Sequence, residues 1–332
     1  IISPHTRPHE GGPMKITNKT GLPQPIVDAV IGENNWSRGG ADISVTELIS
    51  PIRQVALRIH YENDIVEDAS DRLFALMGQI GHSILEKSSG SSVFPEKRFH
   101  MNLANWELSG KVDALYLNEL RDEEGNKLGS YGIDDYKFTS AYVAKPRKPG
   151  ERSRLDDWFL QLNLYRMLAL HNGFEISQLR LILLLRDWSI LAAKRDPDYP
   201  QQQVAVIDVP IMELKTLKKW AFTRIEHHME AQQGMDQYGQ SHLPDCTDED
   251  RWAKPETYAV MKEGRKSALR VLDSLAAARE WQIKNLGAGE PDPSHIPHIS
   301  IVQRPGQNVR CENYCEVSQW CSQWKTLQDG QS

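Results

Sequence analysis

The chain contains two short stretches, GKVD at residues 110–113 and IDDYK at residues 133–137, that predict two adjacent strands carrying acidic side chains. Because successive side chains of a strand point to opposite faces, Asp135 and Lys137 share one face. The segment between the strands is charged and contains glycine and asparagine, which is typical of a hairpin loop. We therefore expect Asp113 to meet Asp135 across paired strands.

These two strands carry the residue types that metal-assisted phosphodiester hydrolysis needs. The carboxylates of Asp113 and Asp135 can hold a divalent cation, and the ammonium group of Lys137 can orient a water molecule or stabilise developing negative charge. Asp134 points to the opposite face and is assigned no metal. The alternative interpretation is an ordinary surface hairpin, because short motifs often occur by chance.

A third element follows at residues 158–170, an apolar stretch with helical periodicity. Gln161 and Tyr165 lie four positions apart and therefore share one helical face. The order of a Gly-x-x-Asp strand, an Asp-x-Lys strand and a Gln-x-x-x-Tyr helix resembles the RecB-type branch of the PD-(D/E)xK nucleases. The resemblance covers residues 40–325.

The resemblance implies an α/β fold with a restriction-endonuclease-like core, in which helices flank a mixed central sheet. It implies a DNA nuclease that depends on Mg²⁺ or Mn²⁺, with exonuclease the favoured mode, although no residue distinguishes exonuclease from endonuclease. Its partners would be single- or double-stranded DNA and a helicase, a recombination protein or a second copy of the chain. Gln161 and Tyr165 would position the DNA backbone.

The family has a further catalytic helix upstream that carries a histidine and often a glutamate. Here His82 and Glu86 lie one turn apart on a predicted helix. The resemblance implies that His82 binds the metal together with Asp113, Asp135 and the backbone carbonyl of Tyr136, and it gives Glu86 a catalytic role. As alternatives, His82 bonds a nearby carboxylate, and Glu86 only holds His82 in one tautomer.

A basic segment joins the second strand to the Gln-x-x-x-Tyr helix. Its prolines and glycine predict a loop, and its five basic residues outnumber one acidic residue: Lys145, Arg147, Lys148, Arg152 and Arg154. The net charge of −6 argues against a broad basic surface, so positive charge should be local. We interpret the segment as a DNA-binding loop that tracks phosphates, with a solvated linker as the alternative.

The cysteines form a separate pattern in the last third of the chain, with one distant member and a C-x3-C-x5-C run: Cys246, Cys311, Cys315 and Cys321. A reduced cytoplasmic setting disfavours disulfides, whereas four thiolates can close a metal site that staples the C-terminal tail to the body. The aromatic residues around the run are predicted to pack over this site, with stacking on DNA bases as the alternative: Trp252, Tyr314, Trp320 and Trp324.

Nucleases of this superfamily in helicase–nuclease complexes and CRISPR adaptation carry a [4Fe–4S] cluster with a similar three-plus-one pattern, which implies a cluster here. Two features depart from that pattern. The family run is usually C-x2-C-x5-C, and its lone cysteine precedes the catalytic residues, whereas Cys246 follows them. Zn²⁺ is the main alternative, because four thiolates suit it equally, and free buried thiols are the remaining one.

The chain divides into three predicted segments: an N-terminal arm at residues 1–43, a nuclease core at residues 44–235 and a C-terminal segment with the cysteines at residues 236–332. Ser44 and Glu47 form a capping box that starts a helix predicted to end near residue 60. The remaining predicted elements are helices at 26–31, 211–233 and 266–284 and strands at 98–103, 178–191, 203–209 and 298–303.

The composition, with 39% hydrophobic and 25% charged residues, is that of a globular protein. The N-terminus lacks the features of a signal peptide, and the longest apolar run, at residues 181–185, is too short to cross a bilayer. We therefore expect cytoplasmic localisation and no membrane partner. The stretches GLP at 21–23 and ISVTELI at 43–49 resemble phage-encoded members of the nuclease group, which implies a bacterial host cell and a phage or prophage origin.

Two other functions are compatible with the sequence. One is a nuclease fold that binds nucleic acid without cleaving it, and the intact set of His82, Asp113, Asp135 and Lys137 weakens it. The other is a structural adaptor held together by a four-cysteine metal site, which leaves the carboxylate–lysine strand unexplained. Active hydrolysis is therefore the expected function.

Overall fold

A computed structural model describes residues 15–32, 38–87, 93–121, 127–147, 153–286 and 299–330. The chain forms two compact units, Ile1–Leu243 and Pro244–Ser332. The predicted catalytic residues all belong to the first unit, and the four cysteines all belong to the second.

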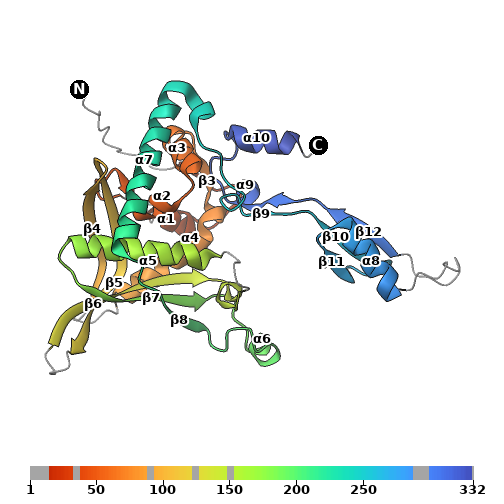
Figure 1. The fold of residues 1–332 in the computed structure, drawn as a ribbon, viewed down its shortest axis with the longest axis horizontal. Coiled ribbons are helices and arrows are strands. Elements are labelled where there is room, and N and C mark those ends of the chain that lie inside the picture. Colours follow the sequence, from red (N-terminus) through yellow and green to blue (C-terminus); the bar gives the residue numbers. More distant parts are fainter. Residues whose placement is uncertain are drawn as a thin grey trace, which may run out of the picture. The chain divides into compact units, whose positions relative to one another are not determined.

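Within the described residues, the first unit is built on a six-stranded sheet in the order β2-β5-β6-β7-β8, with β4 also paired to β5 (Figure 1). The pairs β2–β5 and β6–β7 are parallel, and the pairs β4–β5, β5–β6 and β7–β8 are antiparallel. The expected mixed sheet is confirmed. Its strands are β2 Ile43–Ser44, β4 Val93–Leu103, β5 Trp106–Arg121, β6 Lys127–Thr139, β7 Ile176–Leu185 and β8 Val204–Asp208.

The helix α5, Arg154–His171, lies across this sheet (Figure 1). Alternate residues of β7 are fully or almost fully buried, and they pack in one core with apolar residues of α5: Leu179, Leu181, Leu183, Leu185, Leu162, Leu164, Met167 and Leu168. The intervening residues of β7 are partly exposed. The sheet thus has one well-covered face, and that face is the one that carries Asp135, which is 1% exposed.

Six further α-helices complete the described part of the first unit. They are α1 Gln24–Gly32, α2 Val45–Ile49, α3 Ile52–His60, α4 Leu73–Lys87, α7 Leu214–Tyr238 and the short helix α6, Ile190–Arg195, which follows β7 within the described chain. The helix α4 contacts β5 and β6, and α7 contacts α2, α3 and α5. In the N-terminal region, β1 Lys15–Thr17 pairs in parallel with β3 Val66–Asp68.

The predicted helix from Ser44 is in fact two helices, because Pro51 interrupts it. A proline disfavours helical backbone in the residue before it, and Ser50 accordingly has an extended conformation with ψ 159°. The strand predicted at 178–191 ends earlier, at Leu185. Ser189 then caps α6 by accepting a hydrogen bond from the Ala192 amide, so this part of the chain becomes helical.

The second unit contains a three-stranded antiparallel sheet in the order β11-β10-β12 within the described chain. The helix predicted from Lys266 begins only at Leu275, because the Ser274 hydroxyl accepts a hydrogen bond from the Ala277 amide at 3.1 Å and caps the helix there. Its elements are β9 Ala253–Lys254, β10 Thr257–Lys262, β11 Arg270–Leu272, α8 Leu275–Leu286, β12 Ile299–Arg304, β13 Gln307–Asn308, α9 Val309–Asn313 and α10 Ser322–Asp329. In neither unit does a described helix combine the length and apolar character of a membrane span.

A buried ionic cluster anchors the start of the first unit's core. Glu47 is 1% exposed and forms the predicted capping box with Ser44, whose amide donates to the Glu47 carboxylate at 3.0 Å. Arg38 donates two hydrogen bonds to the same carboxylate at 2.8 and 2.6 Å, and Arg58 donates one at 2.6 Å. Burial alone would raise the pKa of Glu47, but Arg38 and Arg58 outweigh it and hold that pKa below its ordinary value.

We predict that Glu47→Gln lowers the free energy of unfolding by about 3 kcal/mol, because it removes the buried charge that both arginines bind. Urea denaturation followed by circular dichroism measures this loss. Glu226→Gln, at an exposed position of α7, is the matched control and should change the stability by less than about 0.5 kcal/mol. Equal stability of the two variants would show that the cluster does not anchor the fold.

Candidate metal centre

The strand register places three carboxylates in one row across three strands. Pairing of β4 with β5 runs through Pro95↔Ala114 and Lys97↔Val112, which puts Glu96 opposite Asp113. Pairing of β5 with β6 runs through Ala114↔Asp134, and one further step puts Asp113 opposite Asp135. The row therefore consists of Glu96, Asp113 and Asp135.

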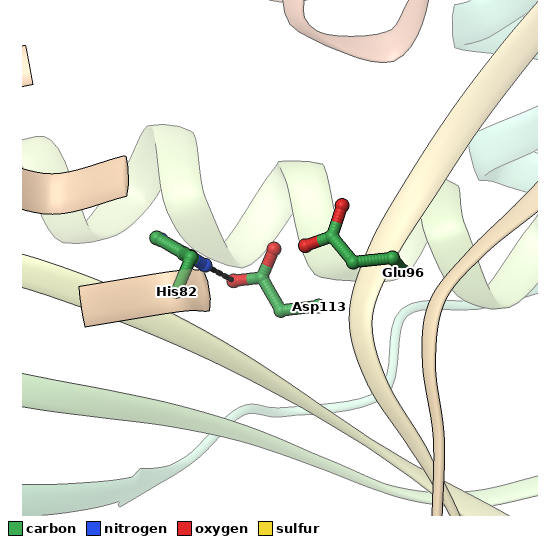
Figure 2. Close-up of side chains that lie close together, drawn as sticks. All are labelled: His82, Glu96 and Asp113. Carbon is green, nitrogen blue, oxygen red and sulfur yellow. Dashed lines mark ion pairs between the residues drawn. The ribbon is translucent and has the colours of Figure 1, made fainter. Parts of the chain in front are cut away.

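His82 reaches this row from α4. Its Nδ1 lies 3.5 Å from Oδ2 of Asp113, and ligand atoms of His82, Glu96 and Asp113 all lie within 4.8 Å of one another. Figure 2 shows the three side chains converging, with the carboxylate of Glu96 turned towards that of Asp113. An imidazole nitrogen and carboxylate oxygens at such separations form a donor set that suits a divalent cation.

Two lysines neutralise part of this negative charge. Nζ of Lys137 lies 2.6 Å from Oδ2 of Asp135, and Lys111 forms an ion pair with Glu96. The Tyr136 amide donates a hydrogen bond to Oδ2 of Asp113 at 2.8 Å, so this carboxylate is held in place by the strand that carries Lys137. Asp135 and Lys137 share a face as predicted, and the ring of Tyr136 lies 6.3 Å from that of His82 between centroids.

The pKa shifts at this centre have a common cause, the crowding of charge in a place with little water. Burial, followed by the charge of Asp135, raises the pKa of Asp113 to about 8. Burial disfavours the charged form of Lys137, but Asp135 and Asp113 outweigh it and raise the pKa of Lys137 above its ordinary value. Burial, followed by the charge of Lys137, lowers the pKa of His82, which favours the neutral imidazole that binds metals.

The residues fit a bound cation on these observations. Burial and the charge of Asp135 disfavour the ionised form of Asp113. A divalent cation bound to the carboxylate would favour that form instead. Asp135 adds a buried carboxylate oxygen, Oδ2, that makes no regular hydrogen bond among the described residues and contacts the ammonium group of Lys137. The carbonyl of Tyr136 stays a prediction as a metal ligand.

Glu96 was not predicted from the sequence, and Glu86 was. The structure leaves Glu86 exposed near the end of α4, outside the group of side chains around His82. The strand predicted to begin at residue 98 begins instead at Val93, so it includes Glu96. Pro95 and the charged residues after it resemble a loop in sequence, and only the pairing with β5 reveals the alignment with Asp113.

Asp134 points to the other face of the strand, as its position predicts, and binds an arginine there. It accepts two hydrogen bonds at 2.7 Å each from the guanidinium group of Arg180 on the neighbouring strand β7. Arg180 in turn lies over the ring of Tyr116, 4.7 Å from its centroid. This pair lies on the partly exposed face of the sheet, opposite to the face that carries Asp135.

Gln161 and Tyr165 are buried beside the carboxylates. The Gln161 side-chain amide donates to the Tyr165 hydroxyl at 2.7 Å, and both side chains are less than one-tenth exposed. Burial, followed by the charges of Asp135 and Asp113, raises the pKa of Tyr165. The ring of Tyr165 also lies against Gly110, where a side chain on that residue would collide with it.

The predicted basic loop lies partly outside the described residues, which include neither Lys148 nor Arg152. Lys145 forms an ion pair with Asp196 at 2.7 Å, and Arg147 forms one with Asp156 at 2.9 Å. Arg154 is exposed in the first turn of α5. The charges of Lys145 and Arg147 are thus partly neutralised by neighbours, and their binding to phosphates stays a prediction.

The cysteines gather within the second unit. Burial, followed by Asp250 and the other three thiols, raises the pKa of Cys246 to about 12, and burial first raises that of Cys315 to about 12. The Gln323 side chain exchanges two hydrogen bonds of 2.9 Å with the backbone of Cys246, which ties it to α10. No three thiol sulfurs of the described chain meet the 4.8 Å separation that the His82 group meets.

The aromatic residues near the cysteines differ in their burial. The rings of Trp252 and Tyr314 lie 5.4 Å apart between centroids, and Tyr314 remains 63% exposed. Trp324 is 9% exposed and belongs to the core of the second unit. Arg310 lies over the ring of Trp252 at 4.7 Å, so the aromatic packing around the cysteines includes a cation–π contact.

Comparisons with known proteins give no family assignment. No family model matches the chain, and no curated protein is significantly similar to it. A solved structure of a protein called SSO0001 is 17% identical and has a TM-score of 0.39, with 60% of this chain and 83% of that chain covered. A structure from Eubacterium rectale named "Putative exonuclease" is 12% identical and has a TM-score of 0.30, with 48% and 52% covered. At these TM-scores neither likeness bears on the function.

We predict that Asp113→Asn stabilises the metal-free protein at alkaline pH. Folded Asp113, with its raised pKa, binds more protons than the unfolded chain between about pH 4 and pH 8, so metal-free stability falls as pH rises through that range. The variant removes this loss, and its free energy of unfolding at pH 8.5 in EDTA should exceed that of the wild type by about 1 kcal/mol or more, or about 2–4 °C in Tm.

The same experiment contains its own control. Asp134→Asn, which breaks the pair with Arg180, should lower the Tm or leave it unchanged at every pH. Added Mg²⁺ should raise the Tm of the wild type and not that of Asp113→Asn. A wild type whose metal-free stability rises steadily from pH 4 to pH 8.5 in step with Asp113→Asn would contradict the charge crowding described above.

Proposed function

We propose that the chain is a metal-dependent deoxyribonuclease of the RecB-type PD-(D/E)xK group that hydrolyses phosphodiester bonds, with exonuclease its favoured mode. The observation that carries the proposal is the row of Glu96, Asp113 and Asp135, with His82 at one side and Lys137 at 2.6 Å from Asp135. A structural hairpin has no need of three aligned carboxylates, because like charges placed opposite one another destabilise a sheet.

The proposed metal ligands are His82, Glu96, Asp113 and Asp135, with the carbonyl of Tyr136 as a further candidate. A bound Mg²⁺ or Mn²⁺ supplies two things, neutralisation of the scissile phosphate and a water molecule of lowered pKa. The ligand set is dominated by oxygen atoms, which favours these hard cations over softer ones.

Lys137 acts on the nucleophile and the phosphate as a cation. In the metal-free site the charges of Asp135 and Asp113 raise its pKa, so we assign Lys137 the role of a cation. Asp135 orients its ammonium group through their ion pair. A charged donor in this position directs the attacking water and stabilises negative charge that develops on the phosphate oxygens.

Tyr165 and Gln161 lie in the core beside the carboxylates and are hydrogen-bonded to each other. Both are buried, and Tyr165 is close enough to the carboxylates to feel the charges of Asp135 and Asp113. In the family that the chain resembles, these residues position the DNA backbone. We therefore propose that Gln161 and Tyr165 bind the phosphate next to the scissile bond. Their mutual hydrogen bond of 2.7 Å fixes the hydroxyl that would take part.

The four cysteines are proposed to hold a [4Fe–4S] cluster that stabilises the second unit. A single Zn²⁺ in tetrahedral coordination with Zn–S bonds of about 2.3 Å keeps its sulfurs about 3.8 Å apart. The four thiols lie close enough to affect the pKa of Cys246, and the three-plus-one arrangement resembles that of the cluster-binding nucleases, so a cluster is favoured over zinc. The cluster would be architectural, because hydrolysis requires no electron transfer.

Glu96 and Glu86 provide the sharpest test of the nuclease proposal. Purified variants are incubated with linear DNA and Mg²⁺ or Mn²⁺, and cleavage is followed on gels. Asp113→Ala, Lys137→Ala and Glu96→Gln should each lower the rate by about 100-fold or more, because each removes a group proposed to bind the metal or the phosphate. Glu86→Gln, on the exposed end of α4, should keep the wild-type rate.

Three outcomes would contradict the proposal. Wild-type protein that binds DNA without cleaving it under any metal condition would make the fold a binding module. Cleavage that persists in EDTA would remove the metal. Loss of activity in Glu86→Gln with full activity in Glu96→Gln would remove Glu96 from the site and support the catalytic role that the sequence predicted for Glu86.

For the cysteines, we predict that protein purified without oxygen is brown and contains about four iron atoms per chain. Cys315→Ser should lose the iron and the colour and unfold at a lower temperature, because the site links both ends of the second unit. Colourless protein with about one zinc atom per chain would replace the cluster with zinc. Metal-free protein with a fully stable Cys315→Ser variant would eliminate the site.

A further inference from the structure

We propose that Phe74, Tyr142 and Arg186 form a binding site for unpaired nucleotides beside the metal centre, which makes single-stranded DNA the substrate. This inference rests on the proposed nuclease function and specifies its substrate class. The three residues come from α4, from the turn after β6 and from the end of β7, the elements that also surround His82 and Lys137. None of them is part of the proposed metal site.

Phe74 presents an aromatic ring that is exposed outside the hydrophobic core. It lies in the first turn of α4 and is 65% exposed, with the apolar side chain of Met77 on the next turn 56% exposed. The ring precedes His82 by eight residues on the same helix, a distance of about 12 Å along the axis. That distance equals about three stacked nucleotides at 3.4 Å each.

Arg186 lies over the ring of Phe74, which remains 65% exposed. Its guanidinium carbon lies 4.2 Å from the centroid of the Phe74 ring. Its backbone amide donates to the Thr139 carbonyl at 2.9 Å, which fixes it at the end of β6. The side chain is exposed and pairs with no carboxylate in the described part of the chain, so its hydrogen-bond donors are open to a phosphate.

Tyr142 adds a second exposed ring at the same end of β6. It is 76% exposed, in the turn η2, Ala141–Ala144, that follows the catalytic strand. The hydrogen bonds that hold this turn include one from the Ala141 amide to Asp187 at 2.6 Å and one from the Tyr142 amide to the Ser140 hydroxyl at 3.1 Å. Asp187 follows Arg186 in the chain, so a hydrogen bond joins the segment that carries the Tyr142 ring to the segment that carries the Arg186 guanidinium group.

Exposed rings next to an available guanidinium group match the chemistry of an unpaired nucleotide. A flat base stacks on an aromatic face with little regard to sequence, and the attached phosphate binds arginine. The bases of a duplex are stacked on one another and offer no free face, so the site selects single strands or frayed ends. A purely apolar protein partner would leave the donors of Arg186 without acceptors.

The test uses the Asp113→Asn background, which prevents cleavage during the measurement. Oligonucleotides carry the fluorescent base 2-aminopurine at positions one to five from the 5′ or 3′ end, and stacking is read as quenching with Mg²⁺ present. Phe74→Leu and Tyr142→Leu should each weaken single-strand binding about ten-fold, which corresponds to about 1.4 kcal/mol, and should reduce the quenching. Phe74→Tyr, which keeps an aromatic face, should restore both.

Tyr238→Leu is the matched control, because Tyr238 is 62% exposed on α7 and should leave binding and quenching unchanged. In the active enzyme, Phe74→Leu should raise KM for single strands and leave kcat within about two-fold of the wild type. Unchanged affinity and quenching in Phe74→Leu would overturn the inference. So would a change in self-association by that variant, measured by sedimentation, without a change in DNA binding. Quenching by a wild type that never cleaves DNA would support the inference and refute the nuclease function.

Discussion

The register between β4, β5 and β6 brings Glu96, Asp113 and Asp135 into one row, and their mutual repulsion governs the chemistry of the site. Two ammonium groups, from Lys137 and Lys111, offset part of it. The ammonium groups do not cancel the repulsion fully, because burial and the charge of Asp135 still raise the pKa of Asp113 to about 8. A shift of one residue between these strands would separate the carboxylates and move their side chains to the other face.

The core beneath the row strengthens these electrostatic effects. Buried leucines of β7 and α5 exclude water from the covered face of the sheet, and Tyr165 and Gln161 close it beside Asp135. In such surroundings charges interact more strongly than in water. The other face of the sheet carries Asp134 with Arg180 and is partly exposed. Two neighbouring aspartates on one strand thus have different partners, Lys137 and Arg180, because alternation puts them in different surroundings.

Local features of the fold could be predicted from the sequence, and long-range alignments could not. The capping box of Ser44 and Glu47 and the shared face of Asp135 and Lys137 follow from spacing alone. Glu96 depends on which residue of β4 faces Asp113, and nothing in its own surroundings specifies that pairing. The separation between the thiols is likewise a property of the folded unit. Pro51 is different, because its effect is local and the helical periodicity around it concealed the break.

Glu96 has one more property, its backbone, which adopts the left-handed conformation with φ 54° inside an otherwise regular strand. For a residue with a side chain this conformation costs about 1–2 kcal/mol, and the pairs on either side, Pro95↔Ala114 and Lys97↔Val112, hold it there. The strained backbone at Glu96 lowers the stability of the strand, and the carboxylate of the same residue lies beside that of Asp113. Glycine and asparagine adopt this conformation at lower cost, so either residue at position 96 would relieve the backbone and remove the carboxylate at the same time.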